Sequence, residues 1–223
     1  MKKLISHLSQ FISSHRLSTF EKVLENRTRY LTVALEDIYQ SQNASAVLRT
    51  CDCLGIQDVH IIENKNTFQL NPDVVLGSSK WLNLYQYNKE ENNTISAINE
   101  LKRNGYRIVA TTPHKNDQSL DDMSLDNGRT ALLFGTELNG LSDTALNMAN
   151  EYLRIPIVGF TESYNISVSA AIILYQLTNK LRQSDIPWKL TDSEKDELML
   201  DWLRKSIKRS ELIEKEFLLK QKL

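Results

Sequence analysis

Two polar loops in the second half of the sequence carry residue types that could bind a small ligand. Residues 135–140 (GTELNG) follow the apolar residues 130–134 (TALLF), and Ser142 behind them is a good N-cap for a helix. The glycines would let the backbone approach a flat ligand, with Glu137 at the carboxyl end of a strand. Residues 162–169 (ESYNISVS) place many hydrogen-bonding groups before an apolar helix. Backbone donors beside apolar walls are the mixture that an adenosine-containing ligand needs.

A third polar segment lies earlier, in residues 41–50 (SQNASAVLRT). Asn43 would begin a helix there, and Arg49 would follow about two turns later among apolar neighbours. An arginine in this position is either a satisfied structural residue or a fork aimed at a phosphate or carboxylate. Both interpretations stay open on these residues alone. The polar residues of the other two segments also have purely structural alternatives. Glu137 could merely cap the next helix, and Ser163 and Asn165 could be ordinary N-cap residues.

Other common sites find no support in the sequence. It has no Gly-x-Gly-x-x-Gly loop, no Walker lysine motif and no Gly-x-Ser-x-Gly elbow. Cys51 and Cys53, two positions apart in a predicted helix, point to different sides and suit neither a disulfide nor a zinc site. The histidines lack ligand-like spacing, and we expect no metal and structural or solvated roles for His7, His15, His60 and His114.

The segments that must position these residues alternate between strands and helices. The hydrophobic pattern predicts strands at 30–35, 58–62, 82–87, 107–111, 130–135 and 152–155. It predicts helices at 43–54, 94–104, 142–148 and 167–183. This alternation indicates an α/β fold with a mostly parallel sheet, helices on both faces and a ligand site beyond the carboxyl ends of the strands.

Helical extensions flank this part of the chain, so we expect segments 1–29, 30–187 and 188–223 to be organised separately. The formal net charge is only −1, but residues 1–30 hold six basic against two acidic residues. Such charge either binds a phosphate backbone or forms solvated helix faces. The candidates for RNA binding are Lys22, Arg27, Arg29, Arg204, Lys205, Lys208 and Arg209. Without a long apolar run or a signal-peptide pattern, we expect a cytoplasmic protein without a membrane partner.

Three segments resemble, in order, the three motifs of the SpoU/TrmH family of RNA ribose 2′-O-methyltransferases. They are NASAVLRTCDCLGI, LLFGTELNGLS and IPIVGFTESYNISVSAAIIL, and GSSKW at 77–81 also matches a family segment. The resemblance covers roughly residues 20–185. The helical ends are similar to those of the TrmH subgroup, which methylates guanosine 18 in the D-loop of tRNA.

The resemblance implies a SPOUT fold with a C-terminal trefoil knot and a homodimer whose chains share each active site. It implies S-adenosylmethionine as cofactor, tRNA as partner and a ribose 2′-hydroxyl as methyl acceptor. By the same route, Thr111, Gly135, Ile155 and Tyr164 would hold the cofactor, although the family usually has leucine at the position of Tyr164. Arg49 would be the central catalytic residue, supported by Asn43, Glu137, Ser163 and Asn165.

Two other functions compete with this interpretation. The first is methylation of a ribosomal RNA ribose, because the motifs describe methyl transfer and not the RNA. Ribosomal members often carry a compact N-terminal α/β domain, and 30 helical residues are too few for one. The second is a knotted RNA-binding protein without catalysis, which the intact Asn43, Arg49, Glu137 and Asn165 disfavour. The accepted tRNAs and nucleosides, the cofactor affinity and the final proton acceptor lie beyond what the motifs specify.

Overall fold

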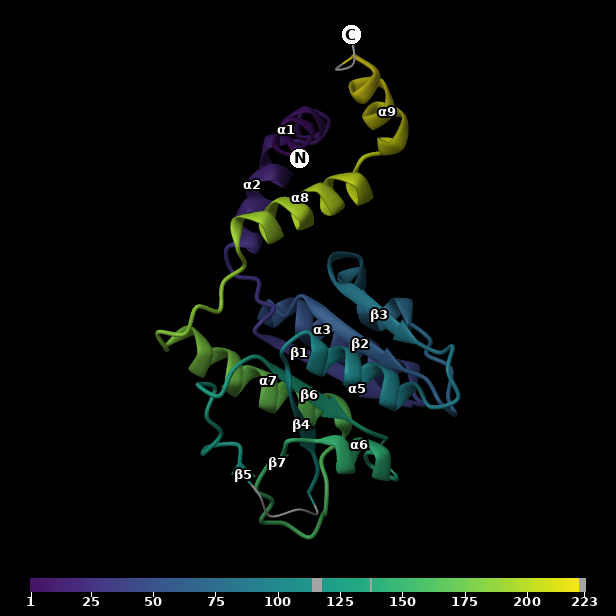
Figure 1. Cartoon of the computed structure of the whole chain (residues 1–223), viewed down its shortest axis with the longest axis vertical. Coiled ribbons are helices and arrows are strands. Elements are labelled where there is room, and N and C mark those ends of the chain that lie inside the picture. The colour runs from purple at the N-terminus through teal and green to yellow at the C-terminus, as the bar shows by residue number, and fades with distance from the viewer. Residues whose placement is uncertain (114–117, 137, 221–223) are drawn as a thin grey trace. The chain divides into compact units, whose positions relative to one another are not determined.

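The computed structural model describes residues 1–113, 118–136 and 138–220 (Figure 1). The chain divides into two compact units. Arg29–Trp188 form the first, which we call the core unit. Met1–Thr28 and the described part of Lys189–Leu223 form the second, which we call the helical unit. The two terminal segments, far apart in sequence, therefore fold together.

The core unit contains a sheet whose strands pair in parallel throughout the described residues. Along the sheet the order is β3-β2-β1-β6-β4-β7-β5. The strands are β1 (Leu31–Glu36), β2 (Asp58–Ile62), β3 (Asn83–Tyr87), β4 (Arg107–Thr111), β5 (Gln118–Ser119), β6 (Thr130–Phe134) and β7 (Glu151–Arg154). The chain builds outward from β1 in one direction and then returns to its other side, which creates a switch point where open α/β sheets bind ligands.

Helices connect the strands of the core unit. They are α3 (Ser41–Leu54), α4 (Pro72–Val75), the 3-10 helix η1 (Ser78–Trp81), α5 (Asn93–Arg103), α6 (Asp143–Met148) and α7 (Ile166–Arg182). All predicted strands and long helices are present with ends shifted by two residues or fewer, which confirms the mostly parallel α/β fold. The sequence pattern missed β5, α4 and η1, because segments of two to four residues are too short to show a period.

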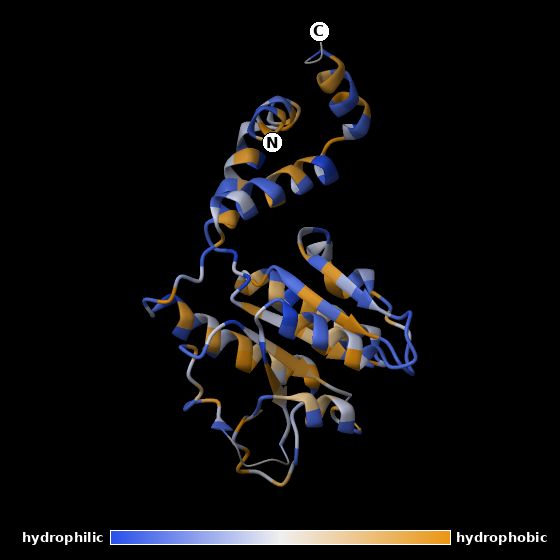
Figure 2. Cartoon of the chain, viewed as in Figure 1, coloured by the Kyte–Doolittle hydropathy of each residue, from blue (hydrophilic) through white to orange (hydrophobic). Residues whose placement is uncertain are grey.

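Side chains of the sheet alternate between two hydrophobic clusters, one on each face. Val33 and Leu35 of β1 pack in the cluster that includes α3 and α7 residues, whereas Ala34 between them packs with residues of α5 and α6. Strand β6 shows the same alternation between Leu132 and Leu133. Because successive strand side chains point to opposite faces, both faces must be covered by helices. Figure 2 accordingly shows apolar colours concentrated on the sheet interior, with polar and apolar residues mixed on the helices.

The helical unit consists of α1 (Lys2–Ser9), α2 (Ser14–Leu24), α8 (Asp192–Ser206) and α9 (Ser210–Lys220) within its described residues. Helix α8 begins with a capping box, in which Thr191 and Glu194 satisfy each other's backbone amides. Trp202 of α8 is buried and meets the ring of Phe20 edge to face at 5.5 Å between centroids. No helix among the residues described has both the length and the apolar character needed to cross a membrane.

Candidate active site

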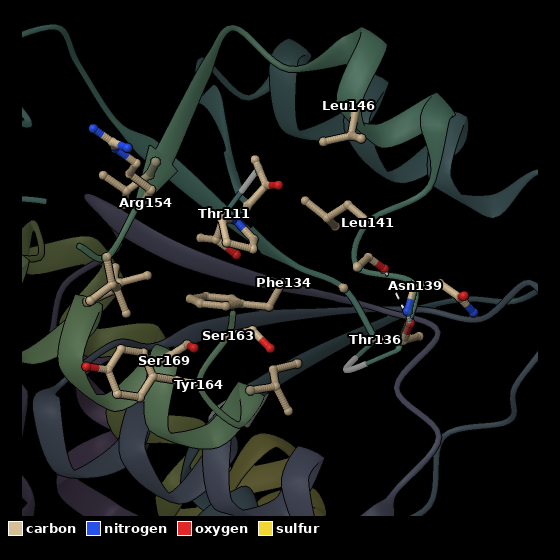
Figure 3. Close-up of a pocket in the computed structure, with 18 of the residues that line it drawn as sticks. Thr111, Phe134, Thr136, Asn139, Leu141, Leu146, Arg154, Ser163, Tyr164 and Ser169 are labelled. Carbon is tan, nitrogen blue, oxygen red and sulfur yellow. Dashed lines mark hydrogen bonds between the residues drawn. The ribbon is translucent and has the colours of Figure 1, made fainter. Parts of the chain in front are cut away.

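A cavity of about 240 Å³ lies beyond the carboxyl ends of β4, β6 and β7 (Figure 3). Thr111, Gly135, Ile155 and Tyr164, the four predicted cofactor residues, all line it. They come from different segments, and the parallel strands gather them because their carboxyl ends meet at one edge of the sheet. The position is the one that the alternation of strands and helices predicts for a ligand site.

Gly135 allows the loop at this cavity to close on itself. A Cβ added there would lie 2.2 Å from the carbonyl carbon of Gly140 and 2.3 Å from the Leu141 nitrogen, closer than any real contact. The close approach is held by two backbone hydrogen bonds of 2.9 Å, from Thr136 N to Gly140 O and from Gly140 N to Thr136 O. The loop therefore requires glycine at position 135. Glu137, predicted to be catalytic, lies outside the described residues.

The cavity combines apolar walls with a few polar groups. Phe134 is buried at its base, and the apolar side chains of Leu141 and Ile155 contribute to its lining. The hydroxyl of Thr111 donates to the carbonyl of Leu133 at 2.7 Å, which ties that side chain to the neighbouring strand. This mixture suits a ligand with an aromatic base and a polar ribose.

Tyr164 forms the rim of the cavity, and 43% of the residue is exposed. Figure 3 shows its ring near Ser169 with the hydroxyl directed away from Phe134. Tyr164 thus adds an aromatic ring to the cavity wall.

Two predicted catalytic residues meet beside the N-terminus of α7. The side-chain nitrogen of Asn165 donates to the side-chain oxygen of Asn43 at 3.2 Å, although 122 positions separate them. The Asn165 oxygen also caps α7, because it accepts from the Ser167 nitrogen at 2.9 Å. The N-cap role considered for Asn165 is therefore real, and its amide group serves both purposes. Ser163, two residues earlier, lines the cavity.

Arg49 lies apart from this cavity in the single chain. It is exposed and lines a shallow groove between α3 and α7, together with Ala46, Ala171 and Tyr175. Its guanidinium reaches the carbonyl of Val74 at 3.5 Å, which is long for a hydrogen bond. A fully satisfied, buried structural arginine does not fit this position.

Comparison with known proteins assigns the chain to a family. The model of the SpoU rRNA Methylase family matches residues 30–175, which is nearly the whole core unit. The chain belongs to the SpoU methylase family. The chain is 49% identical to a protein of Borreliella burgdorferi named tRNA (guanosine(18)-2′-O)-methyltransferase, over 95% of both chains.

Two solved structures show how far the likeness extends in space. The TrmH/SpoU tRNA modifying enzyme of Aquifex aeolicus superposes with a TM-score of 0.77 at 27% identity, and the match covers 87% of the present chain and 98% of that enzyme. The SpoU methyltransferase AviRb of Streptomyces viridochromogenes, solved in complex with AdoMet, gives a TM-score of 0.60 at 21% identity. This match covers 73% of the present chain and 62% of AviRb, and the likeness concerns the fold alone.

The basic residues predicted to bind RNA lie in different environments in the structure. Arg27 is only 1% exposed, with its guanidinium carbon 5.5 Å from the centroid of the Trp202 ring. This burial contradicts an RNA-contacting role, because the packing of α8 covers the side chain. Arg29 forms an ion pair with Asp58 at 3.2 Å and belongs to the core unit.

Ion pairs also engage part of the basic cluster at the end of α8. Arg204 pairs with Glu214 and Lys205 with Asp201, each at 2.6 Å. The exposed members of the predicted set are Lys22, Arg204, Lys205, Lys208 and Arg209.

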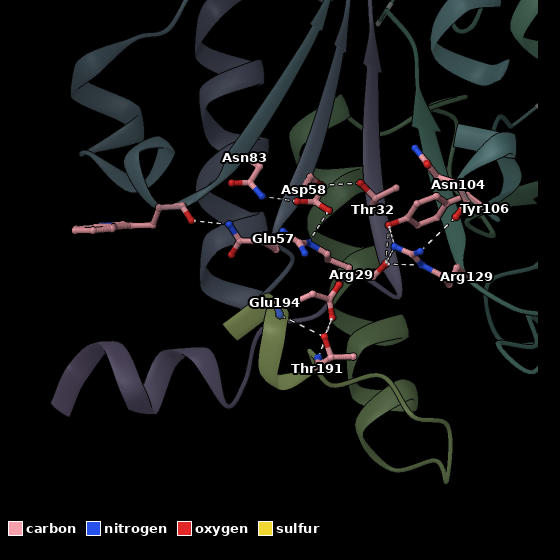
Figure 4. A network of polar contacts seen from close by, with 11 residues as sticks. Arg29, Thr32, Gln57, Asp58, Asn83, Asn104, Tyr106, Arg129, Thr191 and Glu194 are labelled. Carbon is pink, nitrogen blue, oxygen red and sulfur yellow. Dashed lines mark hydrogen bonds and ion pairs between the residues drawn. The ribbon is translucent and has the colours of Figure 1, made fainter. Parts of the chain in front are cut away.

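A polar network at the amino ends of the strands escaped the sequence analysis (Figure 4). The guanidinium of Arg129 donates to the carbonyl of Arg29 and stacks 4.2 Å from the centroid of the Tyr106 ring. Burial raises the pKa of Tyr106 to about 12 and also raises the pKa of Asp58, which the nearby Arg29 partly offsets. This network lies at the edge opposite the cavity, so we assign it to the stability of the core unit.

Proposed function

We propose that the chain transfers a methyl group from S-adenosylmethionine to the ribose 2′-hydroxyl of guanosine 18 in tRNA. The observation that carries this proposal is the cavity in which Thr111, Gly135, Ile155 and Tyr164 meet, with the Asn43–Asn165 pair positioned by the same motif segments. The name of the relative that is 49% identical along 95% of both chains supports the substrate.

The cavity residues fit the cofactor by their chemistry. Phe134, Leu141 and Ile155 would contact the adenine, and the polar groups of the 135–140 loop and of Ser163 would meet the ribose and the amino acid end. The cofactor supplies an activated methyl group on a sulfonium. Glu137 stays a predicted member of this site.

The acceptor hydroxyl is a poor nucleophile while it is protonated, so the protein must position and polarise it. An arginine keeps its proton in proteins because its pKa lies above about 12. Arg49 therefore acts in this proposal as a fork that grips an RNA phosphate and polarises the hydroxyl, and not as the base. In this proposal Asn43, Ser163 and Asn165 support Arg49 by orienting the acceptor ribose and the cofactor.

A second copy of the chain completes the site in this proposal. The groove between α3 and α7 is lined by the exposed Arg49, Cys53 and Tyr175 and by the half-buried Ile172. An apolar groove with an arginine at its rim suits a symmetric contact, in which each chain offers the same surface. The homodimer would bring Arg49 into a shared active site, and the C-terminal part of the core unit would form the knot that the family resemblance implies.

The helical unit supplies RNA affinity in this proposal. The exposed Lys22, Lys208 and Arg209 would bind phosphates without touching the cofactor. The expected setting is the cytoplasm, where tRNA is modified.

Methylation mapping tests the function. The protein is incubated with total tRNA and labelled S-adenosylmethionine, and the ribose methylation is then located in the RNA. We expect label at guanosine 18. Label on ribosomal RNA in a parallel reaction, and none on tRNA, would favour the ribosomal alternative. Cofactor binding without any transfer would indicate a non-catalytic RNA-binding protein.

A further inference from the structure

A buried carboxylate connects residues 135–141, which we call the cofactor loop, to the rest of the core unit. Glu36 is the last residue of β1 and is only 2% exposed. Its Oε1 atom accepts from the hydroxyl of Thr94 at 2.5 Å and from the hydroxyl of Ser142 at 2.7 Å. Its Oε2 atom accepts from the backbone nitrogen of Ser142 at 2.8 Å. One side chain thus joins β1, the first turn of α5 and the start of α6.

Ser142 is the point at which the cofactor loop ends. Its hydroxyl oxygen accepts from the Ala145 nitrogen at 3.1 Å and caps α6. The preceding residues 138–141 line the cavity together with Gly135 and Thr136. At its other end the loop leaves β6, which is held between β1 and β4. Strand pairing therefore fixes the start of the loop, and the bonds between Ser142 and Glu36 fix its end.

The three hydrogen bonds need a carboxylate at this position and not merely a side chain of the same shape. Three donors converge on two oxygens, because Thr94 and Ser142 offer hydroxyls and Ser142 also offers its amide. A glutamine has one oxygen and one NH₂ group. With the NH₂ toward the Ser142 amide, two donors face each other; with the oxygen there instead, the NH₂ donates to the two hydroxyls and their own hydrogens lose the acceptor that Glu36 provides. Leaving buried polar groups unpaired in this way is costly, and the structure would relieve the conflict by moving the loop.

The hydroxyl of Thr94 gives a way to separate the two sides of this carboxylate. It also accepts from the side-chain nitrogen of Asn64 at 2.9 Å, so it connects Glu36 to the loop after β2 and to α5. Removing the Thr94 hydroxyl loosens that side and leaves both bonds from Ser142 to Glu36 intact. The two sides can therefore be disturbed one at a time.

We propose that Glu36 is a positioning residue for the cofactor, acting through Ser142 on the loop of residues 135–141. This inference rests on the proposed binding of S-adenosylmethionine in the cavity. Glu36 itself is not among the residues that line the cavity in the described part of the chain. Its effect is to hold the loop in the shape that accepts the ligand before the ligand arrives, so its loss lowers cofactor affinity more than the rate of the bound complex.

Calorimetric titration of S-adenosylmethionine into purified Glu36→Gln, Thr94→Val and wild-type protein tests this inference. We expect the dissociation constant to rise at least tenfold in Glu36→Gln and to stay within about twofold in Thr94→Val. With saturating cofactor and tRNA, the kcat of Glu36→Gln should stay within about threefold of wild type. Hydrogen exchange should accelerate in the 136–142 peptide of Glu36→Gln and not in that of Thr94→Val.

Ser142→Ala provides a milder variant if Glu36→Gln does not fold, because it removes only the hydroxyl and keeps the backbone amide bond to Glu36. We expect its dissociation constant to rise about threefold. If the variant that folds, Glu36→Gln or Ser142→Ala, bound S-adenosylmethionine as tightly as Thr94→Val does, the role of Glu36 would be overturned. If the wild-type protein itself bound no S-adenosylmethionine, the proposed function would fail instead.

Discussion

Asn43 and Arg49 start from the same helix and reach different surroundings. Asn43 is buried and contacts Asn165, whereas Arg49 is exposed in the groove between α3 and α7. Six positions along a helix turn a side chain by about 600°, which places the two residues on different faces. In the single chain, therefore, Asn43 belongs to the Asn165 contact and Arg49 does not.

Replacing Arg49 with lysine tests geometry apart from charge. Lysine keeps the positive charge and loses the planar fork that can hold a phosphate and orient a hydroxyl together. We expect kcat to fall about a hundredfold, roughly 2.7 kcal/mol of transition-state stabilisation, with cofactor affinity little changed. Single-turnover methylation of tRNA measures the effect. Arg103→Lys, at an exposed arginine of α5, is the matched control, and near-normal kcat in Arg49→Lys would refute the phosphate-fork role.

His60 should make the core unit sensitive to acid. Burial lowers its pKa to about 4, and its Nδ1 atom shares a hydrogen bond of 2.9 Å with the Tyr87 hydroxyl. In the unfolded chain its pKa returns to about 6.5, so the unfolded state binds the extra proton between these values. Stability is full above pH of about 6.5 and is lost as the pH falls toward about 4.

Urea unfolding at several pH values measures the contribution of His60. We expect this residue to account for a loss of the order of 3 kcal/mol between pH of about 6.5 and 4. His60→Phe keeps a ring in the stack with Tyr85 and cannot take up the proton. Its stability should fall less steeply over this range, and an unchanged slope would show that other groups cause the acid sensitivity.

At the scale of single elements, the loop after β6 closes on itself through the hydrogen bonds between Thr136 and Gly140. Gly135→Ala would place a Cβ against the backbone of Gly140 and Leu141, so the loop must open. We expect the dissociation constant of S-adenosylmethionine to rise at least tenfold, measured by calorimetry. Gly159→Ala is the matched control, because a Cβ at Gly159 meets no atom within 4 Å. Equal affinity of the two variants for S-adenosylmethionine would show that the closed loop is not needed for cofactor binding.

The elements also show where sequence patterns are sufficient. Strands β2 (DVHII) and β4 (RIVAT) begin and end at the residues that the sequence pattern predicts, because each is rich in β-branched and apolar residues and follows a glycine turn, at Gly55 and Gly105. Ser142 caps α6 as expected, and Gly55 ends α3 with a φ of 78° that suits glycine. These features depend on neighbours in sequence, so the sequence alone predicts them.

At the scale of the whole molecule, the groove between α3 and α7 should hold a second copy of the chain. Tyr175 is 62% exposed in this groove. Light scattering of the wild-type protein should give twice the mass of the 25.7 kDa chain. Tyr175→Asp should give a monomer with little methyl transfer, because a charge buried in an apolar interface is costly.

Ile95→Asp is the control for this substitution, since Ile95 is an exposed apolar residue in the first turn of α5, on the opposite face of the sheet from the groove. It should leave the mass and the activity unchanged. A Tyr175→Asp monomer with full activity would contradict a site shared between chains.

The sequence by itself determined the alternating strands and helices, the motif segments and the family to which they point. These follow from local periodicity and from residue types within a few positions of one another. It did not predict that the two terminal segments fold into one unit, or that Arg27 is buried against Trp202.

Only the tertiary structure decided which distant residues meet. The Asn43–Asn165 contact spans 122 positions and the bonds between Glu36 and Ser142 span 106. The order of the strands in the sheet brings such residues together. That order depends on how the whole core packs, so it cannot be read from neighbouring residues in the sequence. Burial also distinguishes the charged residues. Arg27 and Glu36 are buried and serve as a structural side chain and a fixed hydrogen-bond acceptor, whereas Arg49 is exposed.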